Sequence, residues 1–174
     1  MHPLQPAPSL RVVVTDGNIL INLSLINRLD LIRKLPPYSF VIPEQVVKEV
    51  KDPAQAAAIE AAISSGMLEE IQLTAIGELT IYGELVQIMG IGEAACLSLA
   101  QSRGWLIASD EKKKFQKETL TRRGPARLLN TAGIFLHAIK LGVVTLEDAD
   151  HAKVLLEARK LKMQFASFRD ILPK

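Results

Sequence analysis

The sequence predicts an α/β fold built around a mostly parallel sheet. Short apolar runs rich in β-branched residues alternate with longer segments whose apolar residues recur every three to four positions. Val12–Thr15 and Trp105–Ser109 are the clearest of these runs, and each is followed directly by an aspartate, Asp16 or Asp110. Strands that alternate with helices are typical of parallel sheets, so we expect that arrangement here.

The first half of the chain is expected to alternate strands with helices. Apolar residues at helical spacing predict a helix over Ile19–Leu35, which the pair Pro36-Pro37 ends. Pro43 suits a helix start, since the first turn needs no N–H there, and Gly66 suits a helix end. The remaining expected elements are a strand over Ser39–Ile42, a helix from Pro43, a helix over Ala54–Ser65, a strand over Leu68–Leu73 and a helix over Ile76–Met89.

The second half continues the alternation after the Gly90–Gly92 loop. Gly142 is expected to end the helix Thr131–Leu141. In the helix Leu146–Arg159, four residues are expected to face inward: Leu146, Ala149, Val154 and Leu155. The expected order is a helix over Glu93–Arg103, the strand Trp105–Ser109, a helix over Lys112–Leu120, a strand over Ala126–Asn130, helices over Thr131–Leu141 and Leu146–Arg159, and a short tail over Met163–Leu172.

Length and composition are those of a single globular domain. A chain of 174 residues can bury one sizeable core. The proline-rich residues 1–10 are expected to form a flexible leader, followed by one domain over residues 11–174. No apolar run approaches the roughly 18 residues of a membrane span. Cys96 is the single cysteine, which excludes an internal disulfide, so we expect a cytoplasmic protein with a buried thiol.

Four acidic residues are expected at one end of the sheet. Ligands of open parallel sheets bind at the carboxyl ends of the strands, where Asp16 and Asp110 lie. Glu49 lies in the helix after the second strand, and Glu93 opens the helix after the glycine loop. Taken alone, Glu93 also fits a favourable interaction with the helix dipole, and Glu49 fits an exposed helix position. Both of these simpler explanations stay open.

Converging carboxylates repel one another unless a cation neutralises them. Oxygen ligands select a hard ion such as Mg²⁺ or Mn²⁺, and the three histidines show no metal-binding spacing. Such an ion lowers the pKa of an attacking water and offsets the charge that builds on a phosphate. The predicted metal ligands Asp16, Glu49, Glu93 and Asp110 therefore suit phosphodiester hydrolysis.

A basic segment follows Asp110. It includes Lys112, Lys113, Lys114, Arg122 and Arg123. One interpretation is a solvated surface, where runs of like charge are common. The other is contact with the phosphate backbone of RNA, which added salt weakens. The net charge of +2 does not decide between them, but the position directly after Asp110 favours the second.

Four motifs, VVVTD, VIPEQVVKE, GEAACLSLA and LIASDE, occur in this order along the chain. Together they resemble the PIN-domain family, in particular its branch of predicted nucleic-acid-binding proteins related to VapC toxins. The similarity extends from about Arg11 to the C-terminus. It implies a three-layer α/β/α fold with a central sheet and a metal-dependent ribonuclease centre.

The resemblance also implies roles for individual residues. By position, the four acids of the family correspond to Asp16, Glu49, Glu93 and Asp110. Glu111 is implied to support the site through a water, and Thr131 falls where the family often has a hydroxyl. Asn18 departs from the family, since relatives commonly carry hydroxyl residues after the first aspartate, and its amide is expected to orient a ligand or a water.

The function hypothesis is a Mg²⁺- or Mn²⁺-dependent endoribonuclease that acts as the toxin of a toxin–antitoxin pair. The resemblance implies an RNA substrate, an antitoxin protein that blocks the acidic crevice, and a homodimer. The alternative is a catalytically weak PIN-fold binding or regulatory module that acts through a protein partner. The presence of all four acids favours the enzyme, and the departure at Asn18 keeps the alternative open.

Overall fold

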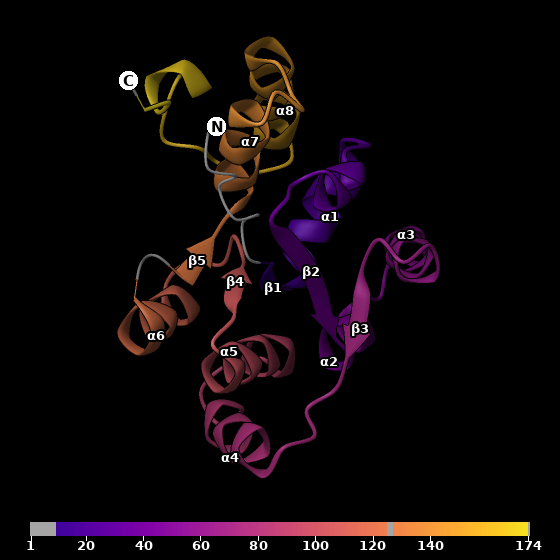
Figure 1. The fold of residues 1–174 in the computed structure, drawn as a ribbon, viewed down its shortest axis with the longest axis vertical. Helices are drawn as coiled ribbons and strands as arrows, with labels where there is room; N and C mark the ends of the chain where they lie inside the picture. Colours follow the sequence, from indigo (N-terminus) through magenta and orange to yellow (C-terminus); the bar gives the residue numbers. More distant parts are fainter. Residues whose placement is uncertain (1–9, 125–126, 174) are drawn as a thin grey trace, which may run out of the picture.

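A five-stranded sheet lies at the centre of the computed structural model, which describes residues 10–124 and 127–173 (Figure 1). Its strands are β1 (Arg11–Thr15), β2 (Tyr38–Pro43), β3 (Glu69–Ile71), β4 (Leu106–Ala108) and β5 (Leu128–Leu129). Their order is β3-β2-β1-β4-β5, and every pairing is parallel. The predicted α/β class and parallel sheet are confirmed. Residues 1–9 of the expected leader, and Ala126 of the expected last strand, lie outside the described residues.

Helices cover both faces of the sheet. They are α1 (Gly17–Leu25), α2 (Glu44–Glu49), α3 (Pro53–Ser64), α4 (Ile76–Leu85), α5 (Ile91–Arg103), α6 (Lys114–Arg123), α7 (Thr131–Lys140) and α8 (Leu146–Ala158). Figure 1 shows α1, α3, α7 and α8 on one side and α4, α5 and α6 on the other. The change of side follows from right-handed crossovers, because the chain passes from β3 back across the sheet to β4. The result is the expected three-layer arrangement.

Three expected helical segments differ from the structure. The helix expected over Ile19–Leu35 is wrong, because α1 ends at Leu25 and a separate 3₁₀ helix covers Leu29–Arg33. Asn27 interrupts it by adopting a φ of 55°, a left-handed conformation that Asn tolerates better than most residues. In α8, Val154 and Leu155 are exposed rather than inward. The expected final helix in the tail is a short 3₁₀ turn, Phe168–Asp170.

The most buried helix is α5, which packs against β1, β2 and β4. Every residue from Ala94 to Ala100 is buried, and three of these are alanine. Small side chains let the helix approach the sheet closely. Cys96 is fully buried, and its thiol donates to the carbonyl oxygen of Thr15 at 3.6 Å, as expected of a structural cysteine. The core thus holds α5 against the strands that end at Asp16 and Asp110.

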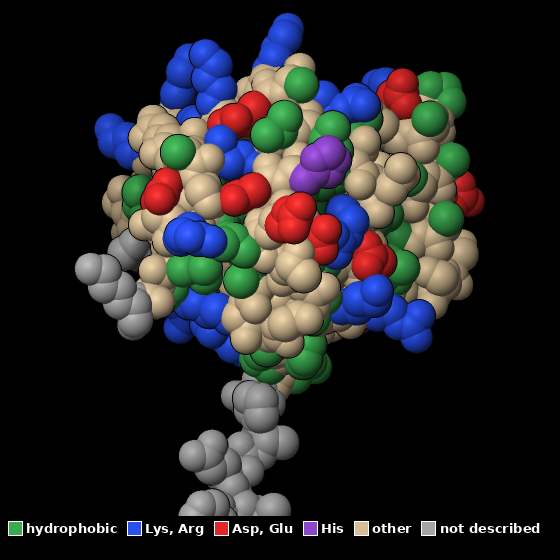
Figure 2. Space-filling model, turned by 90° about the horizontal axis from the view of Figure 1, so that it is seen from above, with side chains coloured by type: hydrophobic (Ala, Val, Ile, Leu, Met, Phe, Trp, Pro, Cys, Tyr) green, Lys and Arg blue, Asp and Glu red, His purple; other side chains and the backbone are tan. Residues whose placement is uncertain are grey.

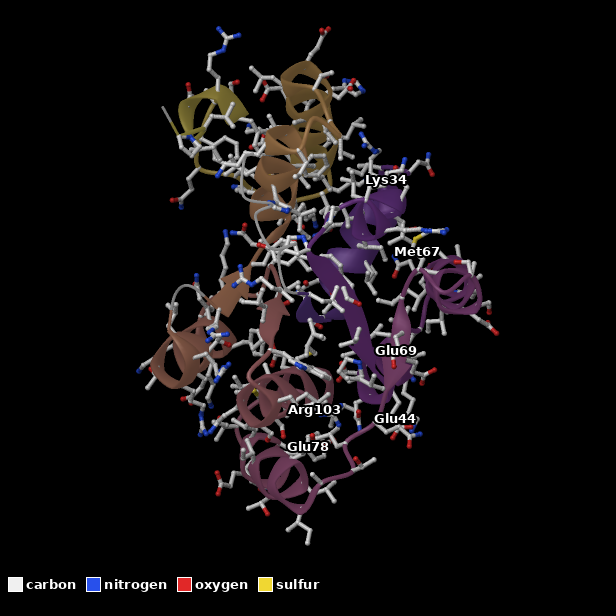
Figure 3. All side chains as sticks on the ribbon, in the orientation of Figure 1. Lys34, Glu44, Met67, Glu69, Glu78 and Arg103 are labelled. Atoms are coloured by element: carbon white, nitrogen blue, oxygen red, sulfur yellow. The ribbon has the colours of Figure 1, made fainter. Side chains whose placement is uncertain are left out.

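A partly buried ion pair joins α4 to α5. Glu78 is 3% exposed, and its carboxylate accepts hydrogen bonds from Arg103 Nε at 2.5 Å and from Arg103 Nη2 at 3.1 Å. Figure 3 shows the two side chains between the helices. The Arg103 guanidinium also stacks over the Trp105 ring, 4.8 Å from its centroid. Hydrogen bonds from Arg103 lower the pKa of Glu78 to about 2, against the opposing effect of burial.

No helix within residues 10–124 and 127–173 is long and apolar enough to cross a membrane.

Replacing Glu78 with alanine is expected to lower the free energy of unfolding by about 3 kcal/mol at pH 7, because Arg103 then loses its buried partner. The folded-state pKa of Glu78 lies below its usual value of 4.5. Its contribution is therefore complete above about pH 4.5 and declines as the pH falls towards 2. Urea unfolding followed by the fluorescence of Trp105, the single tryptophan, measures both effects.

Glu84→Ala is the matched control, since Glu84 is an exposed acid on the same helix. It should change stability by less than about 0.5 kcal/mol. Equal losses in the two variants would contradict a stabilising role for the ion pair.

Candidate active site

The pairing of β1 with β4 places the first predicted acid. Thr15 is the register partner of Ala108, and the Asp16 N–H donates to the Ala108 carbonyl at 2.9 Å. Asp16 therefore lies beside Ser109, whose hydroxyl donates to Asp16 Oδ2 at 3.2 Å. The Gly17 N–H donates to Asp16 Oδ1 at 2.7 Å, so the carboxylate also caps α1. These contacts fix Asp16 at the carboxyl end of the central strand.

Asn18 links Asp16 to Glu111. Its amide nitrogen donates to Asp16 Oδ2 at 3.0 Å and lies 3.3 Å from Glu111 Oε1. Its amide oxygen accepts the backbone N–H of Asp110 at 3.2 Å. The Glu111 N–H in turn donates to the Ser109 hydroxyl at 3.0 Å. One amide thus organises the start of α1 and the chain that leaves β4.

Glu49 and Glu93 meet at the start of α5. Glu93 accepts the Gly90 N–H at 3.1 Å, so its carboxylate is held at the positive end of the helix. Glu49, the last residue of α2, lies against Gly92 so closely that a Cβ at Gly92 would collide with its carboxylate. The same Cβ would lie 3.1 Å from Val46 Cγ2. Glycine at position 92 therefore lets Glu49 reach this end of α5.

Four carboxylates line one pocket of about 350 Å³, here called the acidic pocket: Asp16, Glu49, Glu93 and Glu111. Burial raises the pKa of Asp16 to about 6; hydrogen bonds from Gly17 and Ser109 oppose the rise, and the charges of Glu111 and Glu93 add to it. The pKa of Glu93 is raised as well, by burial and by the charges of Glu111 and Glu49. The like charges are therefore close enough to disfavour one another.

Asp110 lies beside this pocket rather than among its lining residues. Its Oδ1 accepts the Thr131 N–H at 2.9 Å, and its Oδ2 accepts the Asn22 amide at 2.9 Å and the Thr131 hydroxyl. Successive side chains of an extended chain point to opposite sides, so Ser109 and Glu111 face Asp16 while Asp110 turns towards α1 and α7. Thr131, predicted to support the site, donates both of these hydrogen bonds to Asp110.

The basic residues fall into two groups. Lys112, Lys113 and Lys114 are exposed at the start of α6, next to Glu111. Arg122 pairs with Glu118, and Arg123 donates to the Trp105 carbonyl at 3.3 Å. Trp105 precedes β4, so the two arginines lie towards the opposite end of that strand from Asp110. The three lysines therefore follow Glu111 in the chain without lining the acidic pocket, whereas Arg122 and Arg123 lie towards the other end of β4.

The donor atoms of the acidic pocket suit a hard divalent cation. All four side chains offer carboxylate oxygens, the ligands that Mg²⁺ and Mn²⁺ prefer. Burial is the main reason that the pKa of Asp16 is raised to about 6, and the charges of Glu111 and Glu93 add to it; a bound cation would favour the charged form. In the part of the chain that the structure describes, however, no three His, Cys, Asp or Glu side chains are arranged to hold an ion as they stand.

Sequence reasoning missed three residues that shape this site. Ser109 donates to Asp16, Asn22 donates to Asp110, and Gly92 admits Glu49. Asn22 could have been found, because it stands four residues after Asn18 and so shares a face of the predicted helix. Ser109 depends on the β1–β4 register and Gly92 on how α2 meets α5, and neither is visible in the sequence.

Asp110→Ala is expected to lower the free energy of unfolding by about 2–3 kcal/mol, because hydrogen bonds from Asn22 and Thr131 to a charged group are lost. Glu111→Ala should cost less than about 0.5 kcal/mol, since Glu111 is exposed and accepts one long hydrogen bond. Urea unfolding in the presence of EDTA measures the difference without any contribution from metal. Similar losses for the two neighbours would contradict the division of roles.

One family model matches most of the chain. The family model DUF3368, described as a PIN domain, matches residues 12–169. No curated protein sequence is similar enough to count as a relative. A chain in the crystal structure of VapBC2 from Rickettsia felis bound to a DNA fragment from their promoter is 21% identical, with a TM-score of 0.47, over 68% of this chain and 98% of that chain. Because the family match covers most of the sequence, the chain belongs to the PIN-domain family.

Proposed function

We propose that the protein is a Mg²⁺- or Mn²⁺-dependent endoribonuclease that hydrolyses phosphodiester bonds of RNA. The observation that carries this proposal is the acidic pocket, in which four carboxylates gather at the carboxyl ends of parallel strands in a PIN-domain chain. Sites of parallel sheets concentrate at this end. The donor set matches a hard cation, and such a cation, when bound, activates water and stabilises charge on a phosphate.

Each acidic residue of the site has a definable part in this proposal. Asp16, Glu49 and Glu93 supply carboxylate oxygens, as the motifs predicted. Glu111 faces the same pocket, so we extend its predicted role from supporting residue to ligand. Asp110 remains a predicted ligand by family position. Asp110 ties α1 to α7 through Asn22 and Thr131, and we propose that it positions the site in this way.

Asn18 restrains the carboxylates of Asp16 and Glu111. Because its amide contacts both Asp16 and Glu111, the side chains are oriented before any ligand binds. This supports the predicted orienting role of Asn18. The same contacts favour the alternative function, a catalytically weak module that acts through a protein partner, because they occupy oxygens that a metal would use. The metal response described below separates the two.

Partners follow from the family resemblance and from the surface. Figure 2 shows acidic, basic and hydrophobic side chains interspersed over the end of the molecule that carries α7 and α8. Elsewhere, Ile76 and Leu79 on α4 are 84% and 50% exposed, which supports a contact with a second copy or with an antitoxin. We therefore keep a homodimer and an antitoxin as proposed partners of a cytoplasmic toxin.

Asp16→Asn is expected to reduce RNA cleavage at least about 100-fold, because the substitution removes a charged ligand while keeping the shape of the side chain. Cleavage of a labelled RNA with Mg²⁺ or Mn²⁺ is the measurement. Glu60→Gln, an exposed acid on α3, is the matched control and should cleave at the wild-type rate.

Mn²⁺ should also raise the thermal unfolding midpoint of the wild type, and raise it less in Asp16→Asn, since ligands that bind the folded state stabilise it. An unchanged midpoint together with no cleavage would favour the binding module over the enzyme.

Replacing Lys112, Lys113 and Lys114 with alanine is expected to weaken RNA binding and to reduce its salt dependence. Each lost phosphate contact should lower the slope of log K against log salt by about 0.7 for a single strand. Binding to Asp16→Asn protein, titrated between low and high salt, measures this without cleavage. The Arg122→Ala, Arg123→Ala double variant is the comparison, and an equal fall in its slope would show that the basic segment acts as a whole.

A further inference from the structure

A second pocket, of about 380 Å³, adjoins the acidic pocket. We call it the C-terminal pocket, because the segment after α8 forms one of its walls through Leu161, Met163, Gln164 and Phe165. Leu128 of β5 contributes further apolar surface. The volume lies within the range of about 300–1,000 Å³ that is usual for sites of small organic ligands.

The two pockets are joined at the strand end. Glu111 lines both of them, and Asp110 lines the C-terminal pocket. A ligand that reached from one pocket to the other would therefore pass the carboxylates proposed to act in cleavage. The shared residue places the C-terminal pocket next to the carboxylates proposed to act in cleavage.

The walls combine apolar surface with exposed amides. Leu161, Met163 and Phe165 offer apolar contacts. Gln116 and Gln164 also line the pocket, and neither side chain is hydrogen-bonded to protein among residues 10–124 and 127–173. Each amide carries both a donor and an acceptor. A flat group with apolar faces and a polar edge, as in a nucleobase, matches these walls.

The wall formed by the C-terminal segment is held in place. Asp150 of α8 accepts the Ser167 hydroxyl at 2.7 Å and the Phe168 N–H at 2.8 Å. The Phe165 ring packs edge-on against the buried Phe168, with their centroids 5.0 Å apart. An anchored aromatic ring is a ready surface for base stacking, because little entropy is lost when the base binds.

Charge on the pocket suits a nucleotide rather than a neutral ligand alone. Lys112 and Lys162 both line it and are exposed, and they come from separate parts of the chain. Lysine contacts to phosphate hold a strand in register without reading its sequence. The lysines also offset the charges of Asp110 and Glu111, which would otherwise repel the RNA backbone.

We infer that the C-terminal pocket binds the nucleobase next to the phosphate that is cleaved, and so sets the base preference of the enzyme. This inference rests on the proposed function, and it assigns that function a substrate-reading subsite formed by Phe165, Gln116 and Gln164. An apolar side chain of a protein partner is the competing occupant.

The test is an abasic scan. Wild-type protein cleaves a labelled RNA, and the same RNA with single bases removed one position at a time. Removal of the base next to the cut should slow cleavage about tenfold, which is the usual order of effect for one stacked base. Phe165→Ala should cleave the intact RNA about tenfold more slowly than the wild type does. On the RNA that lacks this base, the variant and the wild type should cleave at the same rate.

Phe165→Tyr and Gln87→Ala are the control variants for Phe165→Ala and Gln164→Ala. Phe165→Tyr keeps an aromatic ring and should retain the preference. Gln164→Ala should relax the preference, whereas Gln87→Ala, an exposed glutamine at the end of α4, should not. An abasic scan that is flat in the wild type, or unchanged by Phe165→Ala, overturns the inference and leaves the nuclease proposal standing.

A binding measurement covers the case in which the wild type does not cleave RNA. The four nucleoside 5′-monophosphates are titrated separately into the full-length protein in EDTA, and backbone amide shifts are recorded. Saturable shifts at residues 161–165 that Phe165→Ala abolishes support the pocket even if the nuclease proposal fails. The absence of such shifts with all four nucleotides overturns the inference. The inference is also overturned if Phe165→Ala loses binding to a protein partner while its RNA cleavage is unaltered.

Discussion

The parallel pairing of β1 with β4 is the constraint on which the acidic pocket depends. It brings Asp16 within hydrogen-bonding distance of Ser109, 93 residues away in the sequence, and so decides which side chains after β4 can face Asp16. A shift of one residue in this register would exchange Glu111 for Asp110 at the pocket, because neighbouring side chains alternate in direction. The assignment of roles to the two adjacent acids is thus a property of the sheet.

Gathering carboxylates works against folding, and the structure shows where that cost arises and what offsets it. The pKa of Asp16, raised to about 6, shows that its charged form is disfavoured by burial and by Glu111 and Glu93. Stability must come from other parts of the molecule. The closely packed α5 and the pair of Glu78 with Arg103 provide it, and α5 is also the helix that carries Glu93. The proposed site and its structural support thus meet on one helix.

The sequence predicted the fold class, the parallel sheet and most helices, because alternating apolar patterns report directly on which faces are buried. It also predicted that Asp16, Glu49 and Glu93 would meet, because strand ends and helix starts converge at one edge. It could not separate Asp110 from Glu111, since that depends on pairing register, nor Arg123 from the lysines, since that depends on the path of α6 back along β4. The break at Asn27 was missed because apolar spacing continues through it while the backbone reverses. Local patterns identify elements, whereas the detailed site arises from long-range contacts.

The attachment of the C-terminal segment to α8 through Asp150 has a consequence for how such proteins diverge. The wall that contains Phe165 belongs to a stretch outside the sheet, and its anchor lies on α8. Substitutions can accumulate between Leu161 and Phe165 without disturbing the carboxylates, as is common for loops carried by a rigid scaffold. Related proteins would therefore keep the proposed cleavage reaction while their substrate preference changes.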